Sequence, residues 1–223
     1  MFEFFLKGGL LTWPILLCSV IAFAIVLERL WYFRRIKTNV GNLIAQVKRL
    51  LQEDKLEEAE RLCKETPGPV AHILAVGIHI HKRAYPEKER IISRAGSKEL
   101  RKLEKNLRGL GIIAHISPLL GLLGTVTGMI KCFMKIQELG GRVDASVLAG
   151  GIWEALITTA AGLSVAIPAI IFYHYFEGKV DNFYHQMKDA AEEILEHQST
   201  SAPEHQHDRT PVHQSTGGGK ESW

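Results

Sequence analysis

The chain has few cysteines and little net charge, and both shortages exclude classes of protein. Its three cysteines, Cys18, Cys63 and Cys132, are scattered and lack the spacing of a metal site, so we expect free thiols. The net charge is only +3, and no basic stretch is interleaved with aromatic residues, which excludes nucleic acid as an expected partner. The sequence also lacks a nucleophile–base pair and a phosphate-binding loop. We therefore expect neither an enzyme nor a bound cofactor.

Histidines are the remaining candidates for metal ligands. His79 and His81 stand two residues apart and would point to different sides of a helix, and no carboxylate or cysteine completes a set with His72. We expect these histidines on a polar surface and predict no metal site. His115 lies near one end of an apolar run, where it is either pH-sensitive or simply interfacial.

Charge is segregated along the chain, because long uncharged runs alternate with segments dense in Lys, Arg and Glu. The first run, 10–27, is long enough to cross the ~30 Å hydrocarbon core of a bilayer as a helix. Lys7 is the only basic residue before this run, whereas residues 34–108 hold 18 of the 27 Lys and Arg residues. By the positive-inside rule the 34–108 segment is cytoplasmic and the N-terminus is periplasmic.

We therefore predict an all-α integral membrane protein with three transmembrane helices, long cytoplasmic extensions and a small helical cytoplasmic domain. Helical spacing of apolar residues continues through 40–62, Pro67-Gly68-Pro69 marks a break, and Pro86 is expected to start a helix running through Leu103 and Leu107 to the membrane. The expected divisions are a first transmembrane segment (1–33), a cytoplasmic helical domain (34–108), a second transmembrane helix (109–136), a periplasmic turn (137–144), a third transmembrane helix (145–176), a cytoplasmic C-terminal helix (177–197) and a disordered tail (198–223). Whether the histidines of that tail bind metal stays open.

Small residues form a stripe on each of the last two apolar helices. Such stripes allow close helix approach in a membrane, and glycine costs about 1 kcal/mol per site in a helix interior, so packing must compensate. We expect that one subunit cannot satisfy these faces alone and that they pack against other subunits. The stripe residues are Ser117, Gly121, Gly124, Gly128, Gly151, Ala155 and Gly162.

Glu154 lies ~10–15 Å along the third helix, at 1.5 Å per residue. A mid-membrane acid costs roughly 2.5–3.5 kcal/mol even on insertion scales, so it must be neutral, paired or hydrated. Two interpretations remain open: a carboxylate that handles protons, or a buried acid that hydrogen-bonds a neighbouring helix and fixes its register. For Thr125, Thr158 and Thr159, lining a polar path and bonding back to helix carbonyls are equally favoured.

The stretches GLLGTVTGM (Gly121–Met129) and GIWEALITTAAGLSVAIPA (Gly151–Ala169) resemble the MotA/TolQ/ExbB proton-channel family. The layout is most similar to the ExbB and TolQ branch. The resemblance implies a homopentamer in the bacterial inner membrane, with an ExbD- or TolR-like single-pass partner, a TonB- or TolA-like protein beyond it, and contacts with membrane lipids. It also implies that Thr125 and Thr159 line a polar pore and that Glu154 is the essential membrane carboxylate.

The function expected from this resemblance is a proton-channel subunit of a motor that converts proton motive force into work for transport or envelope processes. The alternative is a non-conducting membrane scaffold that oligomerises and docks a single-pass partner. A secondary transporter is disfavoured, because no repeat of Gly/Pro-interrupted helices surrounds a midplane site. Which process the motor would drive, of the ExbB or the TolQ kind, stays open.

Overall fold

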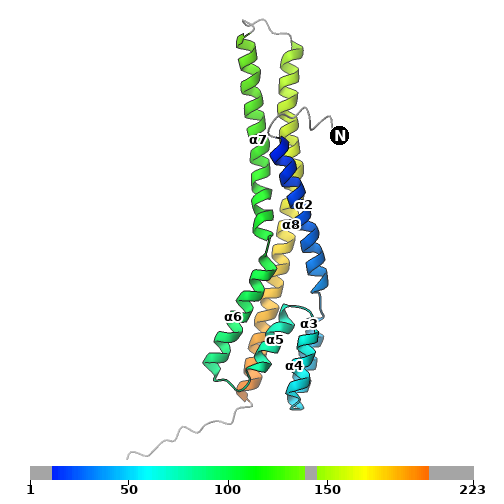
Figure 1. Cartoon of the computed structure of the whole chain (residues 1–223), viewed down its shortest axis with the longest axis vertical. Helices are drawn as coiled ribbons and strands as arrows, with labels where there is room; N and C mark the ends of the chain where they lie inside the picture. The colour runs from blue at the N-terminus through cyan, green and yellow to red at the C-terminus, as the bar shows by residue number, and fades with distance from the viewer. Residues whose placement is uncertain (1–11, 139–144, 201–223) are drawn as a thin grey trace, which may run out of the picture.

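The computed structural model describes residues 12–138 and 145–200, and every regular element in these ranges is a helix. Three long helices, α2 (Thr12–Arg35), α7 (Leu107–Glu138) and α8 (Ala145–Thr200), contain stretches long and apolar enough to cross a membrane. They lie side by side in the upper half of Figure 1, with α7 and α8 antiparallel. The described part of the chain thus confirms the predicted all-α membrane protein.

Large apolar side chains remain exposed around the upper halves of these helices. Trp13, Leu17 and Phe23 of α2 and Leu119 and Leu122 of α7 are more than half exposed. In water such surfaces would be unfavourable, whereas a lipid environment matches them.

The shorter helices α3 (Val40–Gln52), α4 (Leu56–Glu65), α5 (Pro69–His79) and α6 (Tyr85–Glu104) form the lower half of the molecule around the end of α8 (Figure 1). The Asn39 side chain accepts a hydrogen bond from the Asn42 amide and caps α3. Gly68, with φ +128°, precedes Pro69 at the first position of α5, so the break predicted there is present.

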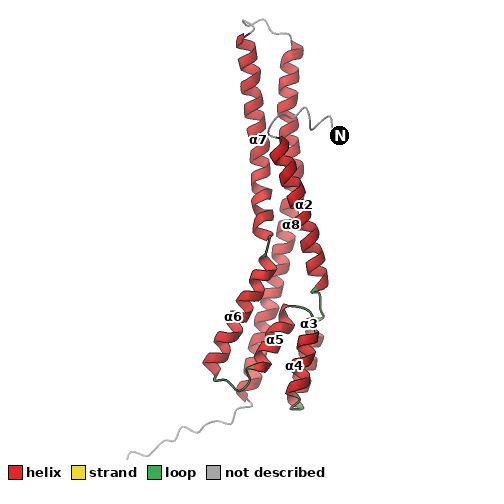
Figure 2. Cartoon of the chain, in the orientation of Figure 1, coloured by secondary structure: helices red, strands yellow, loops and turns green. Residues whose placement is uncertain are grey.

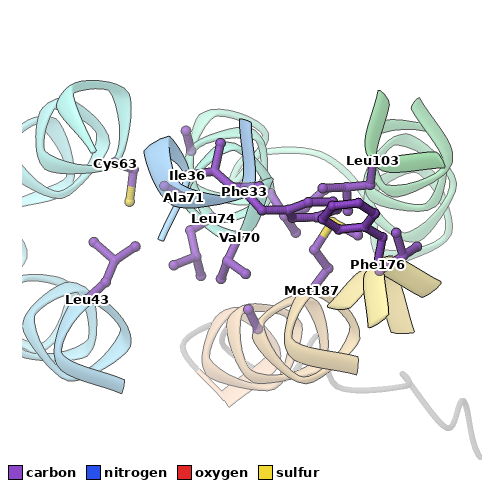
Figure 3. Close-up of a cluster of buried hydrophobic side chains, with 14 of the residues drawn as sticks. Phe33, Ile36, Leu43, Cys63, Val70, Ala71, Leu74, Leu103, Phe176 and Met187 are labelled. Atoms are coloured by element: carbon purple, nitrogen blue, oxygen red, sulfur yellow. The ribbon is translucent and has the colours of Figure 1, made fainter. Parts of the chain in front are cut away.

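A hydrophobic core joins the two halves where the end of α2 meets α5, α6 and α8 (Figure 3). Phe33 of α2 stacks on Phe176 and Phe183 of α8, with ring centroids 5.6 Å and 6.2 Å apart. Leu103 of α6 and Met187 of α8 are buried beside this stack. The membrane helices and the short helices therefore share one continuous core.

The junction of α6 and α7 differs from the sequence prediction. One helix was expected through Leu103 and Leu107, but α6 ends at Glu104 and α7 begins at Leu107, as the loop between them in Figure 2 shows. Asn106 has φ +64°, a left-handed conformation that asparagine tolerates better than most residues. Both leucines are buried on either side of the break, so the change of direction keeps both ends of the junction in the core.

Helix α8 is one continuous helix of 56 residues that contains Pro168. It joins the segments expected as the third transmembrane helix and the cytoplasmic C-terminal helix. Residues 201–223, most of the predicted tail, and the turn residues 139–144 lie outside the described residues.

Candidate functional site

The small-residue stripes of α7 and α8 face each other within one chain. A Cβ placed on Gly162 would lie 2.5 Å from the Ser117 carbonyl oxygen and 3.1 Å from the Gly121 Cα. A Cβ on Gly121 would lie 3.0 Å from the Thr159 Cα. The two backbones are therefore in contact, which only glycine permits at these positions.

The contact continues towards the ends that face the 139–144 connection. A Cβ on Gly124 would lie 2.6 Å from the Thr158 Cβ, and one on Gly128 would lie 2.7 Å from the Ala155 Cβ. Near the end of the helices the spacing relaxes, because a Cβ on Gly151 would lie 3.3 Å from the Cys132 sulfur.

The expectation that these faces need other subunits is wrong. Helices α7 and α8 pack against each other, and the stripe of α7 meets the stripe of α8 in the same chain. Any contact between subunits must use other faces of α7 and α8.

The three candidate threonines all use their hydroxyl groups on helix carbonyls. Thr125 donates to the Leu122 carbonyl at 2.7 Å and Thr158 to the Glu154 carbonyl at 3.0 Å. Thr159 donates across the interface to the Gly121 carbonyl at 2.7 Å. Thr158 is buried against Gly124, whereas Thr125 and Thr159 are half-buried.

Glu154 lies on α8 at the edge of this interface, one turn before Thr158. Its position is about 14 Å from the start of the helix at 1.5 Å per residue. The side chain is half-buried, and among the residues that the structure describes none donates a hydrogen bond or forms an ion pair with its carboxylate. No side chain in the described part of the chain satisfies this carboxylate, so it is left to interact with water or with another chain.

Ser117 has a feature that the sequence did not indicate. Its side chain is fully buried, and its Oγ has no hydrogen-bond partner among the described residues. The next residue, Pro118, has no amide hydrogen to donate to the Ala114 carbonyl. One turn of α7 thus presents a free hydroxyl and a free carbonyl inside the membrane segment.

Arg29 is a residue that the sequence analysis did not single out, because a lone arginine just after an apolar run carries no signal of burial. Its side chain is 2% exposed and forms two hydrogen bonds to the Glu28 carboxylate, at 2.6 and 2.7 Å. Arg29 Nη1 also donates to the Lys102 and Leu103 carbonyls, each at 3.2 Å, and thereby binds the last turn of α6.

The histidines outside the membrane segments have polar partners, as expected for surface positions. His79 Nδ1 lies 3.2 Å from a Glu60 carboxylate oxygen, and His72 Nδ1 lies 3.4 Å from Glu99. Within residues 12–138 and 145–200, no group of three side chains is arranged to hold a metal ion. The histidines at 205, 207 and 213 lie outside these residues.

Comparison with known proteins gives matches over most of the chain. A sequence model of the MotA/TolQ/ExbB proton channel family matches residues 65–189, a range that contains both motifs on which the predicted resemblance depends. A protein of Methanothermobacter thermautotrophicus described as a biopolymer transport protein ExbB homolog is 32% identical over 181 residues, covering 81% of this chain and 64% of that protein. Biopolymer transport protein exbB1 of Vibrio cholerae is 32% identical over 170 residues, covering 73% and 72%. An ExbB-like protein of Synechocystis is 28% identical, covering 84% of this chain and 97% of the relative. The predicted resemblance is confirmed.

Proposed function

We propose, because this chain belongs to the MotA/TolQ/ExbB proton channel family, that it is an ExbB- or TolQ-like subunit of a membrane motor driven by the proton motive force. The observation that carries this proposal is the Glu154 carboxylate, which lies inside a membrane helix without a partner among the described residues. A carboxylate held in that setting can exchange a proton with water or with an acid on another chain.

The proposed channel also requires other subunits and partner proteins. The proposal includes a homopentamer in the inner membrane of a bacterial cell, an ExbD- or TolR-like single-pass partner and a TonB- or TolA-like protein that receives the work. Thr159 supports a hydrated proton path. Its hydroxyl donates a hydrogen bond to the Gly121 carbonyl, and its oxygen lone pairs can still accept hydrogen bonds from water. The N-terminus is proposed to be periplasmic and the C-terminus cytoplasmic.

The contact between α7 and α8 has a direct role in this proposed mechanism. Because the backbones meet at Gly121 and Gly162, neither helix can slide past the other without a clash. Glu154 and Thr159 are therefore held at a fixed height while protons exchange. Rotation or tilting would then occur between this rigid wall and the partner chain, rather than inside the subunit.

Replacing Glu154 is the decisive test. Glu154→Gln keeps the shape and hydrogen bonding of the side chain but removes ionisation, and Glu154→Ala removes both. We expect both variants to assemble with the partner and to reduce proton uptake into vesicles at least tenfold. Thr159→Val should give a milder loss, because water can replace one hydroxyl in a hydrated path.

The matched control is Glu138→Gln, which removes a carboxyl group from the exposed end of α7 and should leave uptake unchanged. Near-normal proton uptake by assembled Glu154→Gln would contradict the proton-handling role. If Glu154→Ala alone lost the oligomer at the same time, the non-conducting scaffold would be the better description.

A further inference from the structure

A groove of about 640 Å³ lies between α7 and α8, next to the point where α6 joins α7. In Figure 1 this point is roughly midway along the molecule, below the apolar part of α7. Six titratable side chains line the groove: Glu104, Arg108, His115, Tyr173, Glu177 and Asp181. A volume of this size holds many water molecules.

The charge of the groove favours protons and other cations over anions. Three carboxyl groups, from Glu104, Glu177 and Asp181, face one permanent cation, Arg108. An anionic lipid headgroup or a phosphate would meet repulsion from these acids. A proton leaving a membrane channel would be attracted to them.

His115 is hydrogen-bonded in a way that suits proton transfer. Its Nδ1 lies 2.7 Å from the Gly111 carbonyl oxygen, and since a carbonyl can only accept, Nδ1 carries the hydrogen and Nε2 keeps a lone pair. The side chain is exposed and lines the groove. Protonation at Nε2 therefore leaves the bond to Gly111 intact.

Glu177 is fixed across the groove by two neighbours on α8. The Tyr173 hydroxyl donates to one carboxylate oxygen at 3.1 Å, and His174 Nδ1 lies 3.1 Å from the other. Gly111 of α7 leaves room for the Tyr173 ring, because a Cβ there would lie 3.0 Å from it. The two helices thus hold a possible proton acceptor on each wall.

The buried Ser117 connects this groove with the membrane site. Ser117 lies two residues from His115, its hydroxyl has no partner among the described residues and its carbonyl oxygen lies beside Gly162. One turn further along α7, the Gly121 carbonyl accepts a hydrogen bond from the Thr159 hydroxyl. The Ala114 carbonyl, which Pro118 leaves without its helical donor, is in the same turn. Polar groups therefore continue from Thr159 to His115 along the interface of α7 and α8.

We propose that the groove between α7 and α8 is the cytoplasmic proton exit of the channel, and that His115 relays protons at the end of the groove nearest the apolar part of α7. A proton arriving through water forms a bond with the Nε2 lone pair and turns His115 into an imidazolium. That N–H bond then breaks as the proton passes through groove water to the Glu177 carboxylate, and neutral His115 is restored. One proton enters and one leaves, so charge balances. This proposal rests on the proton-channel function proposed above.

The test is proton uptake by the full chain reconstituted with its ExbD-like partner, measured with a pH-sensitive dye inside the vesicles. We expect His115→Ala to assemble normally and to lower uptake about fivefold or more. Imidazole, present at the same concentration inside and outside the vesicles so that its entry does not change the internal pH, should restore at least half of the uptake by replacing the missing relay. His185→Ala, at an exposed histidine of α8 outside the groove, should match the unsubstituted chain.

Normal uptake by assembled His115→Ala would overturn the proposal. A loss that imidazole does not relieve, or that a non-basic ring of the same size relieves equally well, would also overturn it, because a relay needs a base and a filled space does not. A second variant, Glu177→Gln, should lower uptake and is not expected to respond to imidazole. If the unsubstituted complex assembled but conducted no protons, the proposed function would fail and this inference with it. If the unsubstituted complex took up protons and His115→Ala did so equally well, the proposed exit would be wrong while the proposed proton-channel function would stand.

Discussion

At Gly162 the backbones of α7 and α8 are in direct contact, since the Ser117 carbonyl oxygen occupies the place where a side chain would begin. Atoms of the backbone cannot move aside as the tip of a flexible side chain can. Substitution at this position therefore has to separate the helices, and its effect reports how much the membrane pair depends on contact between backbones.

We predict that Gly162→Ala destabilises the folded protein by about 1–3 kcal/mol, the usual cost of overpacking. Gly178→Ala is the matched control on the same helix, because no atom lies within 4 Å of its added Cβ, and removing a helical glycine stabilises by up to about 1 kcal/mol. Thermal unfolding in detergent, followed by circular dichroism, measures both. Equal unfolding temperatures would contradict the close contact.

Cys63 is predicted to react slowly with alkylating reagents. Its side chain is 2% exposed, and burial raises the pKa of the thiol from 9.0 to about 11, so little thiolate forms at pH 8–9. The rate of iodoacetamide labelling, followed by mass spectrometry, should be far lower in the native protein than after unfolding in SDS. A cysteine at the exposed Glu58 position should react quickly in both states.

The same raised pKa predicts the direction of a pH effect on stability. The thiol of the unfolded chain ionises around pH 9, whereas that of the folded chain stays neutral up to about pH 11. The contribution of Cys63 to stability is therefore fully present below pH 9 and is lost as the pH rises towards 11. Cys63→Ala should lessen this alkaline loss; an unchanged profile between pH 9 and 11 would contradict the assignment.

At the scale of elements, Arg29 connects the end of α2 to the end of α6. Replacing it with Met leaves the Lys102 and Leu103 carbonyls and the Glu28 carboxylate without these donors. We expect a loss of about 1–3 kcal/mol, the usual cost of leaving buried polar groups unsatisfied. Hydrogen exchange in the last turn of α6 should rise strongly.

Arg35→Met is the control for this change. Arg35 ends the same helix, but it is exposed and lies over the Trp31 ring, 5.6 Å from its centroid. Its replacement should leave exchange in α6 unchanged. If Arg29→Met had the same small effect, the connection between α2 and α6 would not depend on the guanidinium.

The sequence predicted the helices themselves better than the contacts between them. Apolar spacing identified the helical region of α3 and α4, and the Pro67-Gly68-Pro69 break identified where it ends, because local periodicity and backbone restriction decide these features. The break at Asn106 was missed, because Leu103 and Leu107 keep helical spacing across it. The break depends on the backbone conformation of one residue, which the spacing of apolar residues does not indicate.

The candidate site was predicted in the same uneven way. Helical spacing put Glu154 and the small residues on one side of α8, but a stripe shows which face packs closely and not which helix it meets. The lack of a carboxylate partner for Glu154 among the described residues, and the contact of the buried Arg29 with the Lys102 and Leu103 carbonyls, depend on residues distant in sequence. Only the tertiary structure could show these two features.

At the scale of the whole molecule, the proposed orientation can be tested with single cysteines in a background free of Cys18, Cys63 and Cys132. Glu58→Cys should be labelled by a membrane-impermeant maleimide only from the cytoplasm, and Glu138→Cys only from the periplasm. Both positions are exposed, unlike the native Cys63, and Gly141, a simple choice from sequence, lies outside the described residues. The opposite pattern would reverse the orientation.

The continuous helix α8 has a mechanical consequence. Its 56 residues extend about 84 Å at 1.5 Å per residue. About 60 Å of this length separates Glu154 from Ile194, whose side chain fills the space beside Gly77 of α5. A partner that turns against Glu154 must exert an equal and opposite torque on this helix. Because no hinge loop interrupts α8, its torsional stiffness would carry the torque of such a proposed partner to the short helices that pack against its other end.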